Sequence, residues 1–163
     1  MKIRKGYVSN SSSSSFIVIG RGEMEKNLTE FAEYETLVLG DKGNTEFGWE
    51  HTEYHDMWSR INFAYLQTKS GGDRVEWLEM LETTIKEAFN CSAIVWLLDD
   101  DYGADKKRSP YGHRMVWGYI DHQSAACEGE NTEMFDDMDS LKRFLFCHDS
   151  YIQGDNDNRS YDD

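Results

Sequence analysis

The sequence has few cysteines, a single proline and no long hydrophobic run, and these shortages exclude several classes of protein. The longest apolar run covers residues 93–98, whereas a membrane-spanning helix needs about 20 apolar residues, so we expect no membrane segment. Cys91, Cys127 and Cys147 are widely spaced, and no two of them form a Cys-x-x-Cys motif. This pattern predicts reduced thiols in a cytosolic protein, not a disulfide framework or a zinc knuckle.

Basic residues are also scarce. The chain has 17 Lys and Arg against 31 Asp and Glu, which gives a net charge of −14. Residues 1–26 carry five basic and two acidic side chains (+3), so residues 27–163 carry −17. An acidic body disfavours direct binding to nucleic-acid phosphates or anionic membranes. It permits binding to a basic surface of another protein.

The fingerprints of common enzyme classes are missing. The chain has no Gly-x-Ser-x-Gly element, no P-loop and no dinucleotide-binding glycine pattern. We therefore expect no cofactor, and the sequence favours a non-enzymatic protein.

What is present indicates one folded domain. A chain of 163 residues with 13% aromatics has enough material for a real core. We predict a single compact α+β domain over residues 1–153, followed by a polar tail over residues 154–163. Its sheet should be mostly antiparallel, with an N-terminal β-hairpin, and should pack against two or three helices.

The expected elements follow from apolar periodicity and turn residues. Two hairpins are predicted, from residues 3–8 with 16–19 and from residues 35–39 with 45–50. Residues 91–98 should form a central strand covered on both faces, and residues 114–122 a further strand. Helices are expected over residues 24–32, 52–68 and 75–89 (capped by Asp73), and from Asp137 or Asp139 to residue 146.

Apolar residues at helical spacing predict the core. Val75, Leu78, Leu81, Ile85 and Phe89 form the expected buried stripe of the helix over residues 75–89. Further core residues are predicted on the other elements: Trp58, Ile61, Trp96 and Phe144.

Five consecutive serines, Ser11, Ser12, Ser13, Ser14 and Ser15, separate two short apolar runs. Because both flanks read as strands, we interpret the serines as an ordered hairpin loop and not as a linker. The alternative is a ligand-binding nest of backbone N–H groups and hydroxyls for an anion. A phosphate loop would normally add glycines and a following helix, which are missing here.

The start of the chain and several later stretches resemble one group of proteins. The opening Lys2-Ile3-Arg4, then Gly6-Tyr7-Val8-Ser9-Asn10 and the five serines, is similar to that of a group of tailed-bacteriophage proteins. Residues 47–50, 58–64, 118–124 and 141–146 resemble the same group. The resemblance implies a phage origin and a place in the cytoplasm of the infected bacterial host. It implies no activity and no catalytic residue.

Histidines provide the candidates for catalysis and metal binding. His122 with Ser124 and His148 with Ser150 are two His-x-Ser elements, which resemble the signature of two-histidine phosphoesterases. In that family the elements lie much farther apart in sequence. His51 and His55 would share one face of a helix and could bind a metal, although two histidines need a third ligand. The simpler interpretations are chance pairing of the His-x-Ser elements in a chain with five histidines, and surface or half-buried histidines at positions 51 and 55.

Acidic side chains provide the candidates for partner binding. The loop over residues 99–110 contains the single proline, which excludes it from a sheet interior. Its carboxylates could also hold Ca²⁺ or Mg²⁺, but no calcium-loop pattern is present and a solvated charge run is the better interpretation. The predicted partner-binding residues are Asp99, Asp100, Asp101, Asp105, Glu128, Glu130 and Glu133.

Three functions remain open from the sequence. The first is a non-enzymatic interaction protein whose acidic surface binds a host or phage protein. The second is a nucleotide- or phosphoester-binding or -hydrolysing protein that uses His122 and His148 or the serine loop. The third is a minor component of the virion.

Overall fold

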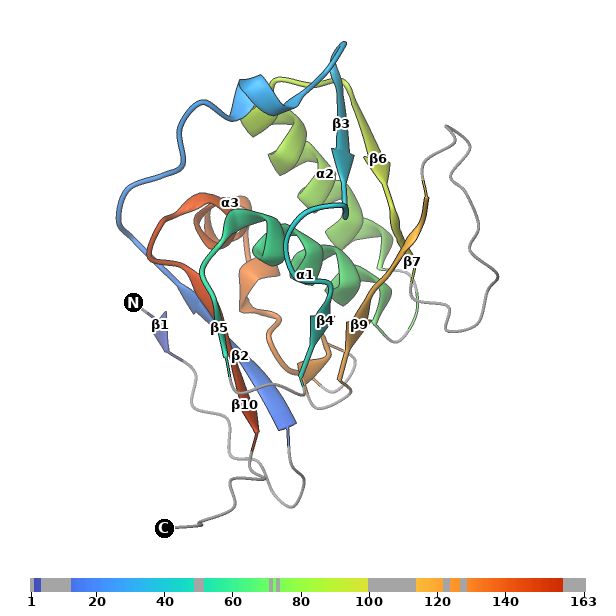
Figure 1. The fold of residues 1–163 in the computed structure, drawn as a ribbon. Coiled ribbons are helices and arrows are strands. Elements are labelled where there is room, and N and C mark those ends of the chain that lie inside the picture. The colour runs from blue at the N-terminus through green and yellow to red at the C-terminus, as the bar shows by residue number, and fades with distance from the viewer. Residues whose placement is uncertain are drawn as a thin grey trace.

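The largest sheet of the computed structural model is antiparallel and joins the two ends of the chain (Figure 1). Strand β2 (Ser13–Ile19) lies between β1 (Lys2–Ile3) and β10 (Tyr151–Asn156). Strand β5 (Glu53–Tyr54) pairs with the other edge of β10. The pairing of β1 with β2 confirms the predicted N-terminal hairpin. The structure describes residues 2–3, 13–48, 52–70, 72, 74–99, 114–121, 124–126 and 129–156.

The remaining strands form three parallel pairs on the other side of the molecule (Figure 1). Backbone hydrogen bonds link two of the pairs, because Leu97 donates to the Leu39 carbonyl (2.8 Å) and accepts from Val116 N (2.7 Å). The pairs are β3 (Thr36–Leu39) with β6 (Ala93–Trp96), β7 (Leu98–Asp99) with β8 (Val116–Trp117), and β4 (Glu46–Phe47) with β9 (Tyr119–Ile120).

The second predicted hairpin is therefore wrong, since β3 and β4 do not pair with each other. The turn between them is anchored to a helix instead. Asn44 N donates to the Ser59 hydroxyl (2.7 Å), and Gly43, at φ 77°, lies directly against the backbone of Trp58. The turn residues correctly predict where the chain reverses direction, but they do not predict which strands pair with each other.

Three helices are described, and capping explains where two of them begin. Helix α1 (Met57–Lys69) begins after Asp56, whose carboxylate accepts from Ser59 N (2.8 Å). Helix α3 (Met138–Phe146) follows Asp137, which accepts from Ser140 N (2.7 Å) and confirms one of the two predicted caps. Helix α2 (Val75–Phe89) ends at Asn90 in the left-handed conformation. The predicted cap Asp73 lies outside the described residues.

Two helix predictions need correction. Residues 53–54 form β5 because the edge of β10 offers them backbone hydrogen bonds, so α1 begins five residues later than predicted. Residues 24–32 contain only the short 3-10 helix η1 (Leu28–Phe31). The segment before η1 is extended along the end of α3, where Glu25 N donates to Phe146 O (2.7 Å). A second 3-10 helix, η4 (Glu133–Phe135), precedes α3.

The core lies between the helices and the strands. Five predicted core residues are completely buried: Ile61, Leu81, Ile85, Phe89 and Phe144. Three predicted core residues are only half-buried: Trp58, Leu78 and Trp96.

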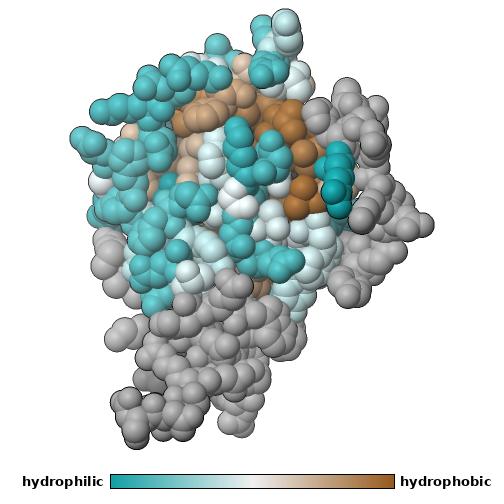
Figure 2. Space-filling view, viewed as in Figure 1, coloured by the Kyte–Doolittle hydropathy of each residue, from teal (hydrophilic) through white to brown (hydrophobic). Residues whose placement is uncertain are grey.

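Two apolar expectations are wrong. Val75 lies in the first turn of α2 and is 60% exposed. Ala93 is exposed and Trp96 half-buried, so β6 is not covered on both faces. Figure 2 shows hydrophobic side chains gathered over β3 and β6, within a mostly hydrophilic visible face.

Both polar ends of the antiparallel sheet extend farther as strands than predicted. Ser13, Ser14 and Ser15 belong to β2 and pair with residues 154–156 of β10. The last three serines are therefore part of a strand and not of a loop, and β10 extends past residue 154, where we placed the start of the tail. No helix within the described part of the chain is long and apolar enough to cross a membrane.

Candidate functional site

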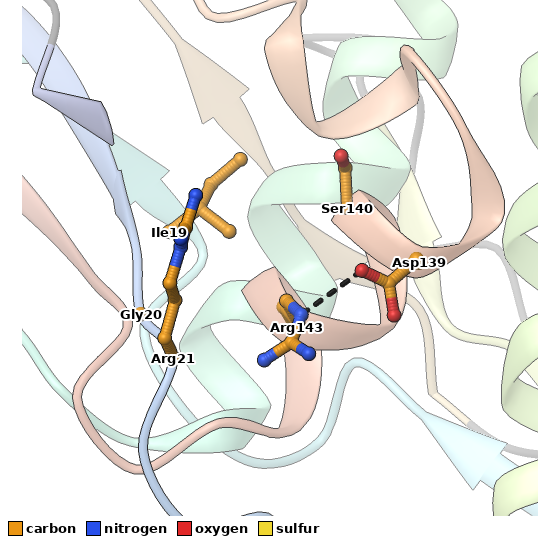
Figure 3. Close-up of a pocket in the computed structure, with 6 residues that line it drawn as sticks. All are labelled: Ile19, Gly20, Arg21, Asp139, Ser140 and Arg143. Carbon is orange, nitrogen blue, oxygen red and sulfur yellow. Dashed lines mark hydrogen bonds and ion pairs between the residues drawn. The ribbon is translucent and has the colours of Figure 1, made fainter. Parts of the chain in front are cut away.

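A pocket of about 340 Å³ lies between the end of β2 and α3 (Figure 3). Arg21 and Ile19 come from the β2 side, and Arg143 comes from α3 on the opposite wall. Arg143 Nε donates to Asp139 Oδ2 at 2.9 Å. Six residues line the pocket: Ile19, Gly20, Arg21, Asp139, Ser140 and Arg143.

The Asp149 carboxylate fixes the loop that carries Arg21. It accepts hydrogen bonds from the backbone N–H groups of Gly22 (2.9 Å) and Arg21 (3.4 Å), and from the Cys147 thiol (2.7 Å). Gly20 N donates to the Ser150 hydroxyl (2.8 Å). A Cβ atom at Gly20 would overlap the Asp149 carboxylate, so this close approach requires glycine. The loop is therefore held against the turn that follows α3.

These hydrogen bonds lower the pKa of Asp149 from 3.8 to about 2, with the Cys147 thiol as the largest cause and Gly22 N–H as the next. The stabilisation is complete above the unfolded-state pKa and is lost as the pH falls through the folded-state pKa. Thermal melting from pH 5 to about pH 2 should therefore show a loss of stability that Asp149→Asn lacks.

The matched control for this titration is Asp41→Asn, which changes another exposed carboxylate. It should keep the wild-type dependence on pH. Parallel pH profiles for wild type and Asp149→Asn would contradict the role given to Asp149.

A buried arginine joins α1 to the same region. Arg60 is completely buried; its Nε donates to Leu145 O (3.2 Å), and its Nη1 donates to the carbonyls of His55 (3.1 Å) and Ser150. Burial lowers the pKa of its guanidinium, and the nearby carboxylates of Glu25 and Asp56 act in the opposite direction. Arg60 thus connects the start of α1, the end of α3 and the residue before β10.

A second candidate surface lies on α2 and the turn before β3. Glu33 and Thr36 exchange backbone hydrogen bonds (2.9 and 2.8 Å), so Tyr34 and Glu35 form a two-residue turn. Both have positive φ (49° and 61°), and Tyr34 is 99% exposed. The turn lies at the C-terminal end of α2, because Ser92 N donates to Glu35 O (2.9 Å).

The outer side of α2 is acidic and leads toward this turn. Glu76, Glu79 and Glu87 are exposed, whereas Lys86 is 3.9 Å from Glu82 and partly neutralised by it. We call the following set the acidic ridge: Glu33, Tyr34, Glu35, Glu76, Glu79 and Glu87.

Comparison with known proteins assigns no family. No protein-family model, no curated protein and no solved structure matches this chain. The resemblance to the phage group therefore stays a prediction, and function has to be inferred from the geometry.

The two His-x-Ser elements use their hydroxyls inside the fold. Ser150 Oγ donates to Arg143 O (2.7 Å), and buried Ser124 Oγ accepts from Ser15 N. His148 is exposed, with its Nε2 3.2 Å from a Glu25 carboxylate oxygen. His122 lies outside the described residues. The Ser124 and Ser150 hydroxyls therefore have structural partners.

The predicted metal pair is only partly described. His55 precedes α1, so the helical spacing assumed for the pair does not apply, and His51 lies outside the described residues. The His55 ring stacks on Tyr151 with centroids 4.8 Å apart, and its Nε2 is 2.8 Å from Glu53 Oε2. No group of three or more His, Cys, Asp or Glu able to hold a metal occurs in the described part of the chain.

The serine run and the predicted acidic residues are also only partly described. Buried Ser15 Oγ has no hydrogen-bond partner within the described residues, and Ser11 and Ser12 lie outside them. Glu130 and Glu133 are half-buried, as is Asp99 at the end of β7. The remaining predicted partner-binding residues also lie outside the described part: Asp100, Asp101, Asp105 and Glu128.

Sequence reasoning missed the acidic ridge and the pocket. The α2 part could have been found, because Glu76, Glu79 and Glu87 follow helical spacing opposite the stripe of Leu81 and Ile85. Nothing in the sequence indicates that Arg21 and Arg143 would line the same pocket.

Proposed function

We propose that this is a phage-encoded binding protein, active in the infected bacterial cytoplasm, whose acidic ridge binds a basic surface of a host protein. The observation that carries the proposal is Tyr34, an almost fully exposed aromatic side chain between two glutamates. Large aromatic residues dominate the energetics of many protein interfaces. Tyrosine provides contact area at a low cost in conformational entropy.

The chemistry of the acidic ridge favours a basic partner. Its five carboxylates attract lysine and arginine, and the Tyr34 ring can receive a cation on its face. The negative charge of residues 27–163 should also steer the first encounter. Because exposed charges are screened over about 8 Å at physiological ionic strength, added salt should slow association more than it speeds dissociation.

The turn that presents Tyr34 supports the same proposal. Two-residue turns of this kind favour Asn-Gly, because both central residues need positive φ. Tyr34 and Glu35 adopt these angles at a cost of about 1 kcal/mol or more each. Keeping two unfavourable residues at a protruding turn is consistent with selection for binding and not for stability.

Charge reversal tests the proposal. Tagged protein carrying Glu76→Lys, Glu79→Lys and Glu87→Lys should recover at least about tenfold less of its basic partner from phage-infected cells, a loss of about 1.4 kcal/mol. Quantitative mass spectrometry of the captured proteins provides the measurement. Asp41→Lys, Glu46→Lys and Glu53→Lys make the matched control, because they change three exposed carboxylates elsewhere by the same charge.

A third variant separates the acidic ridge from the surface predicted from the sequence. It carries Asp100→Lys, Asp101→Lys and Asp105→Lys in the loop over residues 99–110. Loss of the partner in this variant alone would move the binding site to that loop. Equal loss in all three variants would reduce the role of charge to a general attraction and would contradict a defined site.

A further inference from the structure

We propose that the pocket between β2 and α3 binds a small molecule that carries a phosphate group. This site differs from the acidic ridge in both place and charge. Its proposed ligand is an anion, whereas the acidic ridge is proposed to bind a basic surface. Each proposal can therefore be wrong without affecting the other. The argument rests on the hydrogen-bond donors of the pocket, its charge and its size.

The pocket offers more donors than acceptors. Arg143 uses Nε for Asp139, and its two Nη groups have no hydrogen-bond acceptor within the described residues. The Arg21 side chain is exposed and has no acceptor there either. Ser140 contributes a hydroxyl, while its backbone N–H is already used by the Asp137 cap. A guanidinium group presents a planar fork that matches phosphate oxygens.

The charges around the pocket favour an anion. Arg21 and Arg143 come from opposite walls of the pocket, so two positively charged groups are available to an anion bound there (Figure 3). Two carboxylates oppose this effect, but both have partners: Asp139 is bonded to Arg143, and Asp149 to backbone N–H groups and the Cys147 thiol.

The β2 side of the pocket lies in the more basic part of the sequence. Its wall on β2 belongs to residues 1–26, the part of the sequence with a net charge of +3. Strand β1 brings Lys2 opposite Ile19 in the antiparallel register. The β2 side of the pocket therefore belongs to the part of the sequence that carries a net positive charge.

The size of the pocket limits the ligand. A volume of about 340 Å³ is at the lower end of the range for small-molecule sites. It accommodates one phosphate together with a small organic part, for which Ile19 provides an apolar wall. The acidic body disfavours a long polyanion such as nucleic acid. We therefore assign the pocket to a small phosphate monoester.

Calorimetric titration of the full chain with ribose 5-phosphate tests this assignment. We expect a dissociation constant of about 1 mM or lower for ribose 5-phosphate, and no binding of ribose at ten times that concentration. Inorganic phosphate should compete for the site. Arg21→Gln should weaken binding about tenfold, and Arg21→Gln with Arg143→Gln should abolish it, because each removes charged donors to phosphate.

A matched control removes two positive charges outside the pocket, through Lys42→Gln and Lys86→Gln. It should bind ribose 5-phosphate as the wild type does. Because Arg21 is exposed, Arg21→Gln alone should fold normally, and its melting temperature verifies this. The assignment is overturned if wild type fails to bind ribose 5-phosphate, if ribose binds equally well, or if the control loses as much affinity as Arg21→Gln.

Discussion

Replacing Leu81 by alanine should lower the free energy of unfolding by about 2–5 kcal/mol. Leu81 is completely buried on α2, within the cluster that joins this helix to α1 and α3. Removing most of its side chain loses apolar contacts and leaves a cavity, because a packed core relaxes only in part. Urea denaturation followed by tryptophan fluorescence measures the change.

The exposed end of the same helix provides the control for Leu81. Val75→Ala shortens an apolar side chain that is 60% exposed, and it should cost less than about 1 kcal/mol. A cost near zero for Leu81→Ala, or equal costs for both variants, would show that the buried face of α2 is assigned wrongly.

Replacing Arg60 by methionine should cost about 3–5 kcal/mol, an effect as large as that of a core residue, because three backbone carbonyls lose a charged donor. Methionine retains much of the side-chain volume, so packing is largely preserved. The carbonyls of His55, Leu145 and Ser150 would lose their charged donor, and each unsatisfied buried group costs about 1–3 kcal/mol. Part of this loss of stability is offset, because the variant no longer has to bury the charge of the Arg60 guanidinium.

The same denaturation assay measures the Arg60 variant, with Arg21→Met as the control at an exposed arginine. The control should change stability by less than about 0.5 kcal/mol. If Arg60→Met were as stable as wild type, the hydrogen bonds of Arg60 would only offset the cost of burying its charge. Arg60 would then not be a major link between α1, α3 and β10.

Local patterns predicted the parts of the fold that depend on local physics. The stripe of Leu81, Ile85 and Phe89 identified the buried face of α2, and the Asp137 cap identified the start of α3. Both signals lie within a few residues of what they determine. The N-terminal hairpin was predicted for the same reason, from two apolar runs close in sequence.

Interactions between distant segments could not be predicted in this way. β3 pairs with β6 and not with the nearby β4, although its own sequence is equally compatible with either partner. Arg60, Asn62 and Gln67 are buried in α1, where a polarity pattern would place them in solvent. They are buried because they bond to backbone groups from other segments, such as Leu145 O, Lys42 O and Ser124 O.

The candidate sites also differ in whether they depend on one local segment or on distant segments. The α2 part of the acidic ridge follows from helical spacing in a single segment. The pocket depends on Arg21 and Arg143, which come together only because β2 pairs with β10 directly after α3. The exposure of Tyr34 depends on an uncommon turn, which the hydrophobicity of the residue does not indicate.

The most direct test of the proposed function is site-specific photocross-linking from position 34 in infected bacterial cells. A photoreactive phenylalanine derivative replaces Tyr34, and the same derivative at exposed Glu46 on β4 serves as the control. The measured quantity is the yield of covalent adducts with other proteins. Position 34 should give an adduct with one basic host protein, and position 46 should not. Adding Glu76→Lys, Glu79→Lys and Glu87→Lys should remove that adduct. Equal yields from positions 34 and 46, or an undiminished adduct after the charge reversal, would contradict binding through the acidic ridge.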